Sequence, residues 1–279
     1  MVAVNRAQFR DNAWMISGLS SSASTAPAVG RDALLQAFNA LLQPERFKDY
    51  GPNGLQVEGR PAIRKIVSGV TASRALIEAA IDAQADAIFV HHGLFWRGQD
   101  GCVTGWMKQR LALLLAHEVS LFAYHLPLDA HAEWGNNAQL GRVLGLQADG
   151  RFGEQDLGFV GGWAEGLTPC AAPDMARHLE SRLGRPVVSV QGSPDPIERV
   201  AWCSGGAQGY FEAAIAAGAQ AFITGEISEP QAHLARETGV AFIAAGHHAT
   251  ERYGAPAVAA HVAQQLGLAH QFIDIDNPA

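Results

Sequence analysis

Two widely separated stretches of this chain carry the same pattern of residues. Glu78–His92 (EAAIDAQADAIFVHH) aligns without gaps on Glu212–Glu226 (EAAIAAGAQAFITGE), and seven of the fifteen positions are identical. In each stretch an alanine-rich helical segment leads into a short apolar run that is typical of a buried strand. Because such a repeat marks a structural unit that is used twice, this feature predicts two similar halves.

The elements around the repeat continue in the same order. Lys65–Val70 and Arg199–Ser204 precede the two copies as strands, and a helix and a further strand follow each copy. This alternation is typical of parallel sheets with helices on their faces. We therefore predict an α/β fold of two similar βα halves, with mainly parallel sheets packed around a central cleft. The first half is expected to span 30–149 and the second half 150–279.

Apolar periodicity and capping residues predict where the elements lie. Asp32 is expected to cap a helix that ends before Pro44 and in which apolar residues recur at helical intervals, namely Leu34, Leu35, Phe38, Leu41 and Leu42. The other expected elements are strands at 65–70, 87–90, 119–124, 159–163, 187–190 and 271–275, and helices at 73–83, 104–117, 175–183 and 255–266.

Composition limits the classes of function. With 48% hydrophobic residues among 279, the chain can bury a large core. No apolar run approaches the roughly eighteen residues that cross a bilayer, so no membrane partner is expected. A net charge of -7 without a dense Lys/Arg cluster argues against nucleic acid as a partner.

Cysteine usage and the N-terminus complete the general picture. Cys102, Cys170 and Cys203 lack the spacing of a zinc or redox motif and fit reduced thiols, so we expect a cytoplasmic protein. Residues 1–29 are rich in Ser and Ala and lack periodicity. We expect them to form a disordered N-terminal extension.

Polar side chains collect where the predicted strands end. His91 and His92 come directly after Val90, and His247 and Glu251 lie four residues apart, on one face if that segment is helical. The other such residues are His125, Asp129 and His131 in the first half, and Glu226 and His248 in the second. Because carboxyl ends of parallel strands meet at one sheet edge, both sets are expected at one central metal cleft.

Each of these residues also has an ordinary structural role open to it. Backbone carbonyls can satisfy a pair of loop histidines, and Asp129 in a Pro-containing loop can make a turn. Glu226 can lie at the start of a helix from about Ser228, and His247–Glu251 can be a helix N-terminus with a stabilising acid. Their convergence at one edge favours the metal site.

Several segments resemble the signature segments of the dinuclear metal-centre hexamer family, also known as GTP cyclohydrolase I type 2 homologues. They are NGLQVEG from Asn53, HHGLFW from His91, HLPLDAH from His125 with GNN from Gly135, ITGEIS from Ile223 and GHHATERYG from Gly246. The resemblance runs in order from about residue 31 to the C-terminus and matches the short form without an inserted domain. It implies a toroidal homohexamer and two metal ions per chain. The ligands that it implies are His91, His92, Asp129, His247 and Glu251.

Three imidazoles and two carboxylates suit Zn, Fe, Mn, Co or Ni. Two bridged ions make a nucleophile from water at neutral pH, which favours hydrolysis. The resemblance implies ring opening of a cyclic C–N bond in a small molecule, with GTP as the candidate nucleotide. His125 is the candidate general acid or base, although a supporting role is equally open to it, and Glu226 and His248 are candidates to hold ligands or handle protons.

Two further points bear on the substrate and on the class of function. The chain has no GxxxxGK[ST] loop, so Arg97 and Arg252 are the candidates for phosphate contacts, and a surface or ion-paired role is the alternative for Arg252. The second hypothesis for the whole protein is a metal-binding, metal-delivery or regulatory protein without turnover. Exchangeable metal without turnover would distinguish that protein from the hydrolase.

Overall fold

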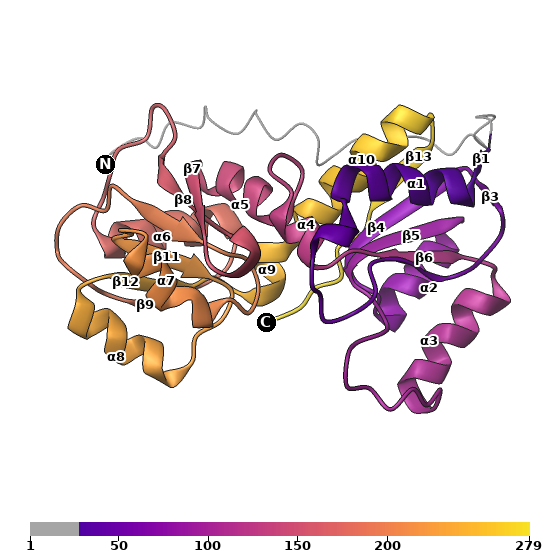
Figure 1. Ribbon diagram of the computed structural model, residues 1–279, viewed down its shortest axis with the longest axis horizontal. Coiled ribbons are helices and arrows are strands. Elements are labelled where there is room, and N and C mark those ends of the chain that lie inside the picture. Colours follow the sequence, from indigo (N-terminus) through magenta and orange to yellow (C-terminus); the bar gives the residue numbers. More distant parts are fainter. Residues whose placement is uncertain (1–27) are drawn as a thin grey trace, which may run out of the picture.

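The computed structural model describes residues 28–279. The predicted disordered extension, 1–29, lies outside these residues except for its last two. Val29 belongs to the short strand β1 (Val29–Gly30), which pairs antiparallel with β3 (Ala62–Ile63). The rest of the described chain folds into two α/β lobes that lie side by side, each built on its own sheet (Figure 1).

The first lobe is a five-stranded sheet with helices on both faces. Its elements are α1 (Arg31–Leu42), β2 (Gly54–Val57), β4 (Lys65–Thr71), α2 (Arg74–Asp82), β5 (Ala87–His92), α3 (Gly105–Ala116), β6 (Ser120–Ala123), α10 (Gly254–Leu266) and β13 (Ala269–Phe272). The sheet order is β13-β4-β5-β6-β2, and only β2 runs antiparallel to its neighbour. The apolar sides of α1 and α10 cover one face, and those of α2 and α3 cover the other (Figure 1).

The second lobe is a six-stranded mixed sheet, also covered on both faces. Its elements are α5 (Asn136–Leu144), β7 (Leu146–Phe152), β8 (Gly158–Trp163), α6 (Ala172–Leu183), β9 (Val188–Val190), β10 (Val200–Trp202), α7 (Phe211–Ala216), β11 (Ala221–Thr224), α8 (Glu229–Thr238) and β12 (Ala241–Ala244). The order is β7-β8-β10-β11-β12-β9, in which only the neighbours β10-β11 and β11-β12 are parallel. Helices α5 and α6 pack on one face, and α7 and α8 on the other.

The predicted repeat is confirmed by the topology. The first copy lies in β4-α2-β5-α3-β6 and the second in β10-α7-β11-α8-β12, with the three strands adjacent and parallel in each sheet. The aligned stretches cover the end of α2 with β5, and α7 with β11. Equivalent strand ends therefore occur once in each lobe.

Three expectations about the fold need correction. The lobes do not divide at residue 150, because β7 crosses that position and α10 and β13 return to the first sheet, where β13 pairs with β4. The second sheet is mixed and not mainly parallel, since its three remaining pairings are antiparallel. Gly30, and not Asp32, is the N-cap of α1, so Asp32 lies in the first turn, where its charge favours the helix dipole.

The helices within residues 28–279 are short, and the longest, α10, has 13 residues. None of them combines the length and the apolar character that crossing a bilayer requires. Two helices of five residues, α4 (Leu126–Ala130) and α9 (His247–Glu251), lie between the lobes (Figure 1). Three 3-10 turns complete the described elements: η1 (Pro44–Arg46), η2 (Glu154–Asp156) and η3 (Gln208–Tyr210).

Candidate metal centre

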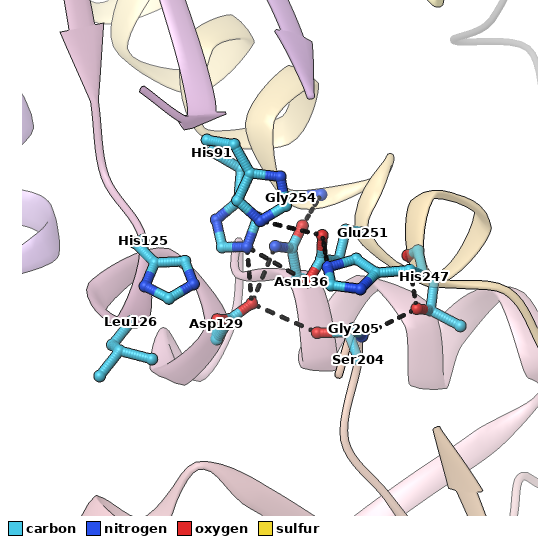
Figure 2. A network of polar contacts seen from close by, with 12 residues as sticks. His91, His125, Leu126, Asp129, Asn136, Ser204, Gly205, His247, Glu251 and Gly254 are labelled. Atoms are coloured by element: carbon cyan, nitrogen blue, oxygen red, sulfur yellow. Dashed lines mark hydrogen bonds and ion pairs between the residues drawn. The ribbon is translucent and has the colours of Figure 1, made fainter. Parts of the chain in front are cut away.

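The five residues predicted as metal ligands come together between the lobes. His91 and His92 are the last two residues of β5, Asp129 lies in α4 after β6, and His247 and Glu251 begin and end α9 after β12. All three elements are at the carboxyl ends of parallel strands, where open α/β sheets bind ligands. In Figure 2 the labelled members of this set point toward one another.

Glu251 is the centre of the set. Its Oε1 lies 3.4 Å from His91 Nε2, and its Oε2 lies 3.4 Å from His92 Nε2 and 3.1 Å from His247 Nε2. Asp129 Oδ1 lies 3.5 Å from His91 Nε2. The donor atoms form two groups that could each hold an ion, one of His91, Asp129 and Glu251 and one of His92, His247 and Glu251.

The imidazoles are anchored through their Nδ1 atoms, which leaves each Nε2 facing Glu251. His91 Nδ1 donates to the carbonyl of Tyr124 at 3.1 Å, and His247 Nδ1 donates to Glu226 Oε1 at 2.6 Å. His92 Nδ1 lies 3.2 Å from the hydroxyl of Thr71. A partner on the far ring nitrogen is the usual device that fixes the tautomer and orientation of a metal-binding histidine.

Buried polar atoms without hydrogen-bond partners test whether a metal fits here. His91 Nε2 and Glu251 Oε2 are buried and have no hydrogen-bond partner. Because His91 Nδ1 carries the proton that it donates to Tyr124, neutral His91 presents a lone pair to two carboxylates, which is favourable only with a cation between them. The donor set therefore fits a divalent cation, and it suits Zn, Fe, Mn, Co or Ni without choosing among them.

The pKa values describe the same unbalanced charge. Burial alone lowers the pKa of His91, but the charges of Asp129 and Glu251 outweigh it and raise that pKa to about 9. The Glu251 carboxylate, whose Oε2 lies 3.1 Å from His247 Nε2, is the main cause that raises the pKa of His247 to about 9. Burial favours neutral Glu251, yet the neighbouring His91 and His92 hold its pKa well below the usual range. The carboxylates that raise the pKa values of His91 and His247 are thus the groups whose charge a metal cation would balance.

Asp129 is held by two side chains of the second lobe. Its Oδ1 accepts hydrogen bonds from Asn136 Nδ2 at 2.9 Å and from the hydroxyl of Ser204 at 3.2 Å. Asn136 in turn accepts from the backbone N–H of Gly254 at 2.9 Å, at the start of α10 (Figure 2). Sequence reasoning missed Ser204 and gave Asn136 no role beyond its place in the GNN motif.

Substitution of Gly254 by Ala tests this support. A Cβ at Gly254 would lie 2.4 Å from Asn136 Oδ1 and 2.6 Å from the backbone nitrogen of Asn136, so α10 and α5 must move apart. We expect a loss of about 1–3 kcal/mol of unfolding free energy, the usual cost of overpacking. Metal affinity should fall as well, because Asn136 holds Asp129. Thermal unfolding and metal titration measure the two effects.

Gly30→Ala is the matched control, since nothing lies within 4 Å of a Cβ at Gly30 and its φ of -64° suits alanine. That control should leave stability and metal binding near wild type. If Gly254→Ala also behaves like wild type, the close approach of α10 and Asn136 does not support the site.

His125 stands beside the ligands and depends on a residue that sequence reasoning missed. His125 Nδ1 donates to Asp49 Oδ1 at 2.7 Å, while Asp49 Oδ2 accepts from the N–H of Leu126 and from Asn53 Nδ2, both at 2.9 Å. Burial favours neutral Asp49, but the hydrogen bond and charge of His125 overcome it and lower the Asp49 pKa to about 2. His125 also groups with His91 and His92 as a possible third set of metal donors.

The structure places the remaining candidates differently. Glu226 contacts the site through His247, to which its carboxylate is hydrogen-bonded. His248 does not join the ligands: its Nε2 donates to Asp274 Oδ1 at 2.9 Å, because adjacent residues of a helix project about 100° apart. His131 Nδ1 accepts from the N–H groups of Glu133 and Trp134 and forms a local turn.

A cavity of about 290 Å³ opens beside the ligands. It is lined from the first lobe by Tyr50 and His125, and from the second by Glu154, Cys203 and Tyr210, among others. His92, Asp129, His247 and Glu251 also line it, so a small molecule in the cavity would touch the metal donors.

Comparison with known proteins gives the following relatives. A family model described as Duf34/NIF3 (NGG1p interacting factor 3) matches residues 29–278. The GTP cyclohydrolase 1 type 2 homolog of Pseudomonas aeruginosa is 50% identical over 255 residues, which cover 90% of this chain and all of that protein. The protein of the same name from Neisseria meningitidis serogroup B is 53% identical over 241 residues, covering 86% of this chain and 96% of that protein.

Solved structures share the fold over the same region. Protein ybgI, described as of unknown function, superimposes with a TM-score of 0.86 at 44% identity, covering 90% of this chain and all of that chain. TTHA1606 from Thermus thermophilus gives a TM-score of 0.80 at 36% identity, with the same coverage. The two-lobe α/β architecture is therefore shared with these proteins.

Proposed function

The chain belongs to the Duf34/NIF3 family, as the motifs predicted, and we propose that it is a hydrolase that uses two divalent metal ions to open a cyclic C–N bond. The observation that carries this proposal is the position of Glu251. One oxygen, Oε1, faces His91, which forms the first group of donors together with Asp129. The other oxygen, Oε2, faces His92 and His247, which form the second group. A carboxylate shared in this way is typical of two-metal hydrolases.

In this proposal His91, Asp129 and Glu251 hold one ion, and His92, His247 and Glu251 hold the other. The ions would supply Lewis acidity, which activates water and polarises the bond under attack. Asn136 and Ser204 keep Asp129 in place, and Glu226 keeps His247 oriented.

We assign proton transfer to His125. It lines the cavity beside the donors, and Asp49 fixes its Nδ1, so Nε2 is the nitrogen available to a bound molecule. In the proposed hydrolysis the hydroxyl of water goes to the ring carbon and the proton of that water goes to His125 Nε2. The C–N bond then breaks, and His125 passes the proton to the nitrogen that leaves. Asp49 stabilises the charged form of His125 during this exchange.

The substrate class is proposed from the names of the relatives. Proteins about 50% identical to this chain are named GTP cyclohydrolase 1 type 2 homolog, so a purine whose imidazole ring opens is the first compound class to test. On the basis of the motif resemblance we also propose a homohexamer, for which sedimentation equilibrium should give six times the chain mass of 29.6 kDa. A monomer at micromolar concentration would refute the hexamer.

The test of the proposed reaction is turnover by metal-loaded protein. GTP and guanosine are incubated in parallel with wild type and with Asp129→Asn, and products are separated by mass spectrometry. We expect a ring-opened product that has gained one water from at least one of the two compounds, and no product from Asp129→Asn.

Two bound ions without turnover on these compounds, or on a panel of cyclic amides, would refute the hydrolase. A protein that binds or delivers metal would then be the better account. One observation gives that alternative weight: the side chain of His247 is 29% exposed, so one edge of the site is accessible for exchange.

A further inference from the structure

Two tyrosines from different lobes line the cavity beside the metal donors. Tyr50 follows η1 in the first lobe, and Tyr210 ends η3 in the second. Tyr50 is 56% exposed, and its ring meets that of His125 edge-on, with 6.1 Å between the centroids. A large exposed aromatic ring beside a polar site is typical of a surface that binds a flat ligand.

The side chains that line the cavity include carboxylates and, in the described chain, no Lys or Arg. Glu154 adds a carboxylate beyond the metal donors. Arg97 Nη2 donates to the carbonyl of Asp49 at 2.7 Å, and its guanidinium lies 6.0 Å from the centroid of the Tyr50 ring. Arg252 faces Asp274 at 3.5 Å. Both arginines considered for phosphate contacts are thus engaged outside the cavity.

The rim that carries Glu154 is fixed in place. Gln155 and Asp156 have φ values of 53° and 56°, a left-handed conformation that is strained for residues other than glycine. Gln155 offsets this strain by bonding across to the first lobe, where its side chain donates to the carbonyl of Lys48 and accepts from its N–H. The same pair of hydrogen bonds therefore ties together the two segments that carry Glu154 and Tyr50.

We propose that the cavity binds a planar nitrogen heterocycle that carries no phosphate, with its ring against Tyr50 and Tyr210 and its N–H groups donating to Glu154. This inference rests on the proposed function, because it names the substrate class of the same site. The volume of about 290 Å³ is at the low end for small-molecule pockets, which suits one ring system better than a nucleoside triphosphate.

The experiment measures binding and not turnover. Isothermal titration of metal-loaded wild type with guanosine and with GTP should show guanosine binding at least about tenfold more tightly. Tyr50→Ala should weaken guanosine binding by about tenfold or more, in line with the loss of one stacked ring, while Tyr50→Phe should stay within about twofold. Glu154→Lys should shift the preference toward GTP.

Two results overturn the inference: GTP binding more tightly than guanosine to wild type, or guanosine affinity unchanged in Tyr50→Ala. Circular dichroism confirms that each variant is folded, and Tyr50 and Glu154 are both exposed, so neither substitution disturbs a core. Guanosine that binds as expected but is never opened refutes the hydrolase and leaves this inference standing. If Tyr50→Ala opens guanosine as well as wild type does, this inference is refuted and the proposed hydrolase stands.

Discussion

Glu251→Ala should remove both metal ions from each chain and abolish ring opening. The substitution takes one donor from each of the two groups, because Glu251 Oε1 faces His91 while Oε2 faces His92 and His247. It also leaves buried imidazoles without the charge that balances them, so neither ion keeps a complete set of ligands. The metal content measured by elemental analysis should be about two ions per chain in wild type, as expected for a two-metal site, and near zero in the variant.

The matched control for this variant is Glu237→Ala, since Glu237 is exposed in α8 and lies outside both donor groups. It should retain the wild-type metal content. If Glu251→Ala keeps one ion per chain, the two groups do not share this carboxylate, and the bridging role is wrong.

Asp49→Asn should slow the proposed reaction by about 10- to 100-fold while both metal ions remain bound, the usual effect of losing a group that orients an active side chain. Asp49 makes no hydrogen bond to the five ligands, but its Oδ1 accepts a hydrogen bond from His125 Nδ1 at 2.7 Å. An amide cannot offer the negative charge that stabilises protonated His125, and it must give up at least one of the four hydrogen bonds that Asp49 accepts. Turnover and metal content are measured on the same preparation.

Asp82→Asn is the control, because Asp82 is exposed at the end of α2. It should leave both turnover and metal content unchanged. Loss of metal in Asp49→Asn would show that His125 acts as a ligand, as its grouping with His91 and His92 allows, and would remove it from proton transfer.

The repeat carried much of the fold prediction. It identified the two parallel cores, because a helix that leads into a buried apolar strand is recorded in local periodicity. It could not show that β13 pairs with β4, or that β7, β8 and β9 make the second sheet mixed. Which strand joins which sheet edge depends on contacts between distant residues, and periodicity within a strand does not encode the direction of its partner.

The candidate site, like the fold, was predicted from the sequence only in part. The strand-end rule and the family motifs brought His91, Asp129 and Glu251 to one place, since the carboxyl ends of β5, β6 and β12 meet between the lobes. Asp49 was missed because it lies in an irregular segment, with no pattern to link it to His125. His248 was a candidate for a supporting or proton-handling role, but adjacent residues of a helix face different directions, and its side chain pairs with Asp274.

The most direct test of the central claim is an anomalous difference map from crystals of the metal-loaded protein, recorded at the absorption edge of the bound metal. Two peaks between the lobes are expected, one beside His91 and Asp129 and the other beside His92 and His247, with Glu251 between them. A single peak, or none under metal-replete conditions, would contradict the claim that the two lobes together build a dinuclear metal site.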